Sequence, residues 1–320
     1  MRLPRISAAS YRRITLVVLV AVSVIVVTGA AVRLTNSGLG CVDWPNCTRN
    51  HFVAKASFHP QVEQINRDFT GLVSVAVAVA VLGSFALVPR RRDLIWWSLG
   101  LVAGLVAEIV LGGIVVISHL WPPFVAVHFL LGLALVWNAV VLYERAGHAD
   151  APGTLTVAEP VRTLARALVV LAGAVFATGT VVTGSGPHGG DQNVRRLPFL
   201  VEDVARVHSL TAWTFLAVAV ATLVVLVRTG PTERARRRGA ELVGLIVAQG
   251  ALGYTQYFLG VPPALVLLHV VGAVLVWLVA LRFYLGLFAH PELVGAGSDP
   301  GIEPAQVGRA PAGAPTTVVT

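Results

Sequence analysis

The chain has 320 residues, of which 56% are hydrophobic and only 12% are charged, and its net charge is +8. Soluble domains carry about 25% charged residues, so this composition, with a mean hydropathy of +0.77, excludes an ordinary soluble domain and indicates a membrane protein with lipid as part of its solvent. The basic residues lie in short clusters between apolar runs and not on one soluble face, so we expect no nucleic-acid partner.

Eight apolar runs follow one another along the chain, each near the roughly 20 residues that a helix needs to cross a bilayer. Only helices satisfy all their backbone groups in lipid-exposed runs of this kind, so we predict an all-α membrane protein with eight transmembrane helices. The predicted helices are Ile14–Leu34, Asn66–Val88, Leu94–Ile117, Phe124–Tyr143, Leu164–Val182, Val204–Val227, Glu241–Leu259 and Ala264–Leu285.

The arginines predict the orientation of these helices. If the helices alternate in direction, the arginine-rich N-terminus and the connections after the second, fourth and sixth helices lie on one side. The long loops 35–65 and 183–203 contain few basic residues and lie on the other side. Positive residues stay in the cytoplasm, so we expect both termini inside and both long loops outside. The Ala-, Val- and Arg-rich composition is typical of a GC-rich bacterium, and the expected location is its plasma membrane, crossed several times.

The second half of the chain repeats the first. Ala107–Gly112 matches Ala248–Gly253, and a histidine, His128 or His269, stands 16 residues after each final glycine. A double proline precedes each histidine. The repeat unit contains four helices, an even number, so both halves have the same orientation and a pseudo-symmetry axis along the membrane normal.

The first predicted helix has a basic start and small residues near its end, which could also indicate a signal peptide. However, Thr28-Gly29 in this helix matches Thr178-Gly179 in the fifth helix, so the first helix belongs to the repeated fold. We predict two pseudo-symmetric four-helix bundles. The resulting divisions are an N-terminal half (1–146), a cytoplasmic linker (147–163), a C-terminal half (164–290) and a Pro-, Gly- and Ala-rich tail that we expect to be disordered (291–320).

Three histidines lie inside apolar runs at one predicted depth, roughly 6–8 Å below the outer surface. A single intramembrane histidine could simply bond to a neighbouring helix, but His128, His208 and His269 at a common depth favour a functional role. Histidines that face each other across a helical bundle are suited to bind a haem iron. The second half offers His208 with His269. The first half offers His128 opposite Asn66. Asn66 is the repeat counterpart of His208, but an asparagine is a poor axial ligand.

The first outer loop contains the two cysteines of the chain, Cys41 and Cys47. Outside the cytoplasm such a pair would normally be oxidised, either as a structural link or as a redox-active pair.

Two carboxylates accompany the first-half histidine. Glu63 stands three residues before Asn66 and therefore on the same helix face, although a partner of the helix dipole is the simpler interpretation. Glu108 lies about ten residues from either membrane face in the third predicted helix, and Gln249 is its repeat counterpart. A carboxylate at that depth needs a hydrogen-bonding partner or a proton-handling role, and we expect the first.

These residues together resemble the haem A synthase family. The resemblance extends over Ile14–Leu285 and rests on the two four-helix halves, the loop segments Gly38–Cys41 (Gly-Leu-Gly-Cys) and Asp43–Pro45 (Asp-Trp-Pro), and the histidines at the outer ends of even-numbered helices. It implies an oxidoreductase that converts the C8 methyl of haem O to the formyl group of haem A by successive hydroxylations at the outer side of the membrane. Expected partners are haem O, haem O synthase and assembly factors of terminal oxidases.

The resemblance also implies two haem sites. His208 and His269 would bind the iron of a haem b cofactor in the second half, and His128 would bind the substrate haem in the first. The family usually carries a histidine three residues after the glutamate of the second helix, where this chain has Asn66 after Glu63. This departure predicts that the substrate haem is held by one strong bond.

The remaining roles come from the same resemblance. Glu63 would lie beside the reacting methyl, either as a charge that stabilises the transition state or as a general base for water. Arg67 would belong to the substrate haem site, and Cys41 and Cys47 would form a disulfide.

Two other functions fit the same topology. A di-haem b-type electron-transfer protein would bind both haems through two strong ligands each, and Asn66 argues against it. A transporter with parallel repeats would use the histidines as proton carriers and would bind no haem. The sequence favours haem A synthesis over both.

Overall fold

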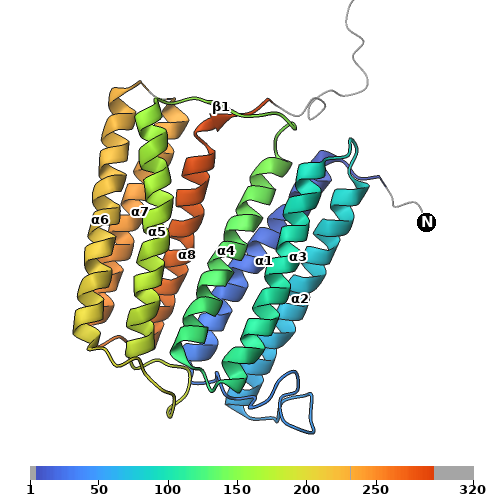
Figure 1. Cartoon of the computed structure of the whole chain (residues 1–320), viewed down its shortest axis with the longest axis vertical. Helices are drawn as coiled ribbons and strands as arrows, with labels where there is room; N and C mark the ends of the chain where they lie inside the picture. Colours follow the sequence, from blue (N-terminus) through green and yellow to red (C-terminus); the bar gives the residue numbers. More distant parts are fainter. Residues whose placement is uncertain (1–4, 231, 292–320) are drawn as a thin grey trace, which may run out of the picture.

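The computed structural model describes residues 5–230 and 232–291, and this part of the chain is almost entirely helical (Figure 1). It contains the eight predicted helices and two strands of two residues each. The helices are α1 (Ala8–Leu34), α2 (Phe58–Ala86), α3 (Arg92–Ile117), α4 (Pro122–Ala146), α5 (Glu159–Ser185), α6 (Val201–Arg228), α7 (Glu233–Phe258) and α8 (Pro263–Leu285). The strands are β1 (Thr154–Leu155) and β2 (Phe288–Ala289).

Several helices begin earlier than their apolar runs predict, and α2 and α7 differ most. Helix α2 begins at Phe58 and not at Asn66, and α7 begins at Glu233 and not at Glu241, because polar residues continue both helices beyond the apolar segment, where hydropathy gives no signal. Glu63 consequently lies beyond the first turn of α2, which contains no acidic residue. The helix dipole acts mainly within the first turn, so the interpretation of Glu63 as a dipole partner is wrong.

Seven of the eight helices in the described residues are long and apolar enough to cross a membrane, which makes the chain a multi-pass membrane protein. The exception is α7, whose first turns contain Arg234 and Arg236–Arg238. Its 26 residues still make a helix about 39 Å long, longer than the hydrocarbon core of about 30 Å. The prediction of an eighth span therefore agrees with the length of α7 but not with its composition.

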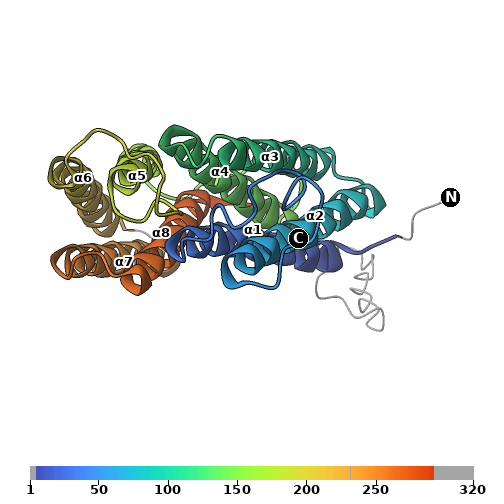
Figure 2. The ribbon, with the colours of Figure 1, turned by 90° about the horizontal axis from the view of Figure 1, so that it is seen from below.

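The helices form the two predicted four-helix bundles. Helices α1–α4 make one bundle and α5–α8 the other, and α1 and α4 of the first contact α8 of the second (Figures 1 and 2). Trp277 of α8 joins the bundles by donating from Nε1 to the backbone oxygen of Leu133 in α4 (2.9 Å), and Phe176 of α5 packs edge-on against its ring. Large apolar side chains also cover the outside of the molecule, as expected where lipid is the solvent.

The two ends of the bundles differ in their connections. Helix α1 begins and α8 ends at one end of the molecule, while the loops after α1 and α5 lie at the other (Figure 1). The predicted linker is fixed near the first end, because β1 pairs antiparallel with β2 just after α8. The tail that we expect to be disordered lies outside the described residues, apart from its first residue.

Candidate functional site

The histidines of the second half face each other across the bundle. The ring centroids of His208 in α6 and His269 in α8 are 6.5 Å apart, with an angle of 73° between the ring planes. Metal–imidazole bonds are about 2 Å long and the ring centre lies about 1.2 Å behind the nitrogen, so two imidazoles on opposite sides of one metal ion have centres about 6.4 Å apart. The spacing of His208 and His269 therefore fits two axial ligands of one haem iron.

Each of these rings packs against a glycine on the preceding helix. A Cβ atom at Gly179 or Gly253 would lie 3.1 Å from Cε1 of His208 or His269, respectively, so a larger residue at either glycine would displace the ring. Thr178 also forms a hydrogen bond with Nδ1 of His208 (3.1 Å). This bond orients the ring and leaves the other nitrogen, Nε2, available for a metal.

The first half repeats this arrangement with different side chains. Asn66 in α2 accepts a hydrogen bond from the hydroxyl of Thr28 (2.8 Å), the counterpart of the bond between His208 and Thr178. Asn66 thus stands where the second half has a histidine. A Cβ placed at Gly29, the counterpart of Gly179, would meet no atom of another described helix within 4 Å, so the shorter asparagine does not pack on this glycine as His208 packs on Gly179.

The ring of His128 in α4 packs near Gly112, whose Cβ would lie 3.5 Å from Cε1 of the histidine. Its Nδ1 lies 2.6 Å from Oε2 of Glu108 in α3. The two groups are close enough for an ion pair, but their angles are not those of a hydrogen bond, and Nδ1 has no other partner among the described residues. The hydrogen-bonding partner that we expected for Glu108 is therefore not found among the described residues, and its close contact is instead the ring of His128, which the sequence did not identify. The equal 20-residue spacing of Glu108 to His128 and of Gln249 to His269 contained that signal.

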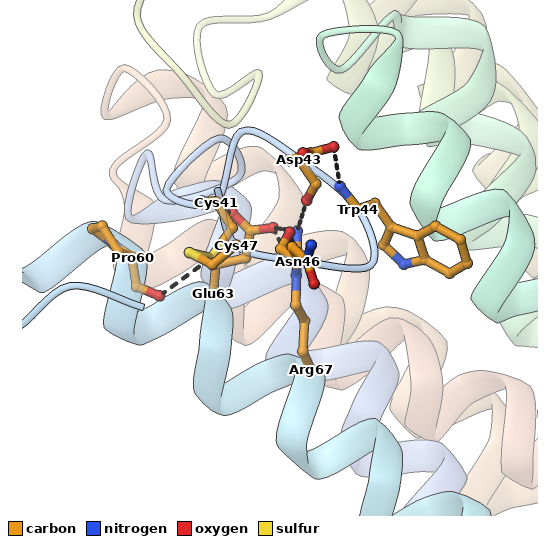
Figure 3. Close-up of polar contacts among 8 residues, drawn as sticks. All are labelled: Cys41, Asp43, Trp44, Asn46, Cys47, Pro60, Glu63 and Arg67. Carbon is orange, nitrogen blue, oxygen red and sulfur yellow. Dashed lines mark hydrogen bonds and ion pairs between the residues drawn. A yellow bond between two sulfur atoms is a disulfide. The ribbon is translucent and has the colours of Figure 1, made fainter. Parts of the chain in front are cut away.

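Glu63 lies in a different cluster, under the loop between α1 and α2 (Figure 3). Its side chain is nearly buried and both oxygens are occupied: Oε2 accepts from the backbone nitrogen of Cys41 (2.7 Å), and Oε1 accepts from Nη2 of Arg67 (2.6 Å). Arg67 also donates to the backbone oxygens of Asp43 and Asn46, at 3.1 Å each. The ion pair therefore ties the loop to α2.

The predicted disulfide is present, between Cys41 and Cys47. It closes the loop directly above Glu63. Trp44, between the cysteines, points away from this cluster and packs on α3, where a Cβ at Gly113 would lie 2.7 Å from its ring (Figure 3). The loop is thus held at three points: the disulfide, Arg67 and Trp44.

The predicted site residues therefore form separate groups in the described structure. Cys41, Cys47, Glu63 and Arg67 lie together, and so do His208 and His269. Among the described residues, no hydrogen bond or ion pair joins Glu63 directly to Asn66 or His128, although all three residues belong to the first bundle.

Comparison with known proteins places the chain among cytochrome oxidase assembly proteins. The model of the family described as "Cytochrome oxidase assembly protein" matches residues 12–59 and 52–281. A protein named heme A synthase from Methylobacterium nodulans is 32% identical over 314 residues, covering 78% of this chain and 84% of that protein. A heme A synthase from Methylobacterium sp. (strain 4-46) is 32% identical over 331 residues, covering 85% and 90%. A shorter match, 33% over 98 residues and 30% of each chain, is to the heme A synthase of Geobacillus thermodenitrificans.

Proposed function

The chain belongs to the cytochrome oxidase assembly protein family, and we propose that it makes haem A by oxidising the C8 methyl group of haem O to a formyl group. It is then an enzyme of haem biosynthesis, of the oxidoreductase class that acts on CH groups. The observation that carries this proposal is the pair of related half-sites with unequal ligands, His208 with His269 in one and His128 with Asn66 in the other. One half suits a permanent cofactor and the other an exchangeable substrate.

The second half would hold a haem b cofactor between His208 and His269. The ring spacing and the two glycines behind the rings support this assignment. When bound, this haem supplies a redox centre beside the substrate half. The protein contributes two neutral imidazoles, and Thr178 fixes the orientation of one of them.

The first half would hold the substrate haem through His128. Asn66 already bonds to Thr28, so the substrate iron would have only one strong protein ligand. Weak ligation suits a molecule that must enter, react and leave. Arg67 and Glu63 would lie at the outer edge of this site, next to the loop closed by the disulfide.

The chemistry requires two hydroxylations of one methyl carbon, and each of them takes up the oxygen of one water molecule, releases two protons and passes two electrons to an electron acceptor outside this chain. The resulting geminal diol then loses water to give the aldehyde. If each step removes electrons from the carbon, positive charge develops there, and the Glu63 carboxylate can stabilise it or can take a proton from attacking water. In either role its position is set by Arg67 and by the nitrogen of Cys41.

The reaction would take place at the outer side of the plasma membrane, with both termini in the cytoplasm. The clusters of arginine at the opposite end of the bundles support this orientation. We also propose haem O synthase and assembly factors of terminal oxidases as partners, because a hydrophobic haem must be passed between membrane proteins.

Extraction of haems tests the proposal directly. Membranes that contain this protein and a source of haem O should yield haem A, whereas membranes that contain only the haem O source should yield haem O. The haems are separated and quantified by chromatography. If haem O alone accumulates while the purified protein carries two firmly bound haems b, the di-haem electron-transfer function is the correct one.

The disulfide can be tested separately. Mass spectrometry of the non-reduced protein should find Cys41 and Cys47 linked. We expect the double variant Cys41→Ala/Cys47→Ala to retain haem b and to lose haem A formation only partly, on the order of tenfold, because Arg67 and Trp44 still hold the loop. Complete loss of haem A formation with normal haem b content would instead show that the pair takes part in the redox chemistry.

A further inference from the structure

Glu108 is a carboxylate inside the membrane-spanning part of α3, and the proposed reaction does not use it directly. Its side chain is 14% exposed, and Oε1 has no hydrogen-bond partner within the described residues. An ionisable group at this depth is costly and needs a compensating contact. That contact is with Nδ1 of His128, 2.6 Å from Oε2.

The second half lacks this charge at the equivalent position. Gln249 in α7 donates from Nε2 to the backbone oxygen of His269 (2.7 Å) and not to its ring. Nδ1 of His269 has no partner in the described structure. The other ligand, His208, bonds to a neutral hydroxyl. The two halves therefore differ in the charge behind their histidines as well as in the number of histidines.

A carboxylate behind an imidazole changes the properties of that imidazole as a ligand. Its negative charge next to Nδ1 favours the tautomer with the proton on that nitrogen, leaves Nε2 free to bind a metal, and increases the electron donation of the ring. Greater donation stabilises ferric iron more than ferrous iron, and the axial ligand and its hydrogen bonds are among the main determinants of haem potential.

We propose that Glu108 is a positioning residue that holds His128 with Nε2 directed to the substrate iron and lowers the reduction potential of the haem in the first half relative to that in the second. This inference rests on the proposed function, in which His128 binds the substrate haem. Gln249, the counterpart of Glu108 in the second half, carries no charge and therefore does not lower the potential of the second haem.

The variant Glu108→Gln tests the inference, because it places the second-half residue in the first half with nearly the same shape. Purified full-length protein loaded with haem O is titrated electrochemically while the haem absorption bands are followed. We expect the ferric-to-ferrous preference of the first-half haem to fall about tenfold, which raises its potential by about 59 mV for a one-electron couple. The second-half haem should not change and serves as an internal control. Glu108→Asp keeps the charge, so the potential of its first-half haem should lie between those of Glu108→Gln and the original protein.

The reciprocal variant Gln249→Glu provides a second measurement that does not depend on the stability of Glu108→Gln. A carboxylate there would be repelled by the backbone oxygen of His269 and would turn towards the free Nδ1, so we expect the second-half potential to fall by a similar amount. The inference would be overturned if Glu108→Gln bound both haems and their potentials were unchanged. If Glu108→Gln does not accumulate, an unchanged second-half potential in Gln249→Glu would overturn it instead. If instead the proposed function is wrong and His128 does not bind the substrate haem, the variant His128→Ala should lose no haem. This result distinguishes failure of the proposed function from failure of the inference about Glu108.

Discussion

We expect His208→Ala and His269→Ala each to remove the stably bound haem b, with the haem content of the second half falling from about one per chain towards none. The two rings are spaced for one iron, so losing either leaves a haem held from one side in a bundle shaped for two ligands. The measurement is the low-spin absorption spectrum of the purified protein, together with its haem content.

A matched control is His51→Ala, which removes a histidine whose side chain is exposed on the loop between α1 and α2. This variant should keep the low-spin spectrum. A further variant, His269→Gly, should regain low-spin haem when imidazole is added, since the ring position beside Gly253 is then vacant. An unchanged low-spin spectrum in both His208→Ala and His269→Ala would refute the cofactor site in the second half.

Much of the fold could be predicted from the sequence because hydropathy and repetition are strong signals in a membrane protein. Eight apolar runs correspond to eight helices, and the repeat around His128 and His269 corresponds to two bundles. The helix ends were less predictable. Helix α2 extends to Phe58 and α7 to Glu233 through polar residues, which the apolar periodicity does not mark.

The repeat also predicted more about the site than any single motif. It aligned Asn66 with His208, and the two side chains contact the equivalent threonines Thr28 and Thr178. The partners of Glu63 could not be predicted in this way, because the second half has no equivalent disulfide loop. The bond from the Cys41 nitrogen and the link from Arg67 to loop carbonyls depend on how that loop folds back over α2.

The replacement Glu63→Gln should reduce haem A formation by a factor of about 10² to 10³, while haem b remains bound, because loss of one electrostatic stabiliser costs about 3–4 kcal/mol of transition-state stabilisation. Glutamine preserves the size of the side chain and can still accept the hydrogen bond from Cys41. The negative charge is lost, and with it the ion pair to Arg67. The readout is haem chromatography of membranes with equal amounts of the variant and the original protein, with haem O or its hydroxylated intermediate expected to accumulate.

A surface glutamate provides the matched control. Glu202 lies in the first turn of α6, at the same end of the molecule as Glu63 (Figure 1), with a side chain 62% exposed and paired with Arg206. An exposed ion pair contributes about 0–1 kcal/mol to stability, so Glu202→Gln should leave haem A formation unchanged. Glu63→Asp keeps the charge but withdraws it by one methylene, and its activity should fall between those of Glu63→Gln and the original protein.

The variant Glu63→Gln also distinguishes a Glu63 that takes part in catalysis from one that only holds the loop in place. If the carboxylate serves only to hold Arg67 and Cys41, the disulfide and Trp44 remain as attachments, and Glu63→Gln should lose no more activity than the double cysteine variant, on the order of tenfold. A loss of 10² or more, with normal haem b content, exceeds what loosening the loop can cause and assigns the charge to the reaction itself. Normal haem A yield would exclude Glu63 from catalysis and direct attention to its ion-pair partner Arg67.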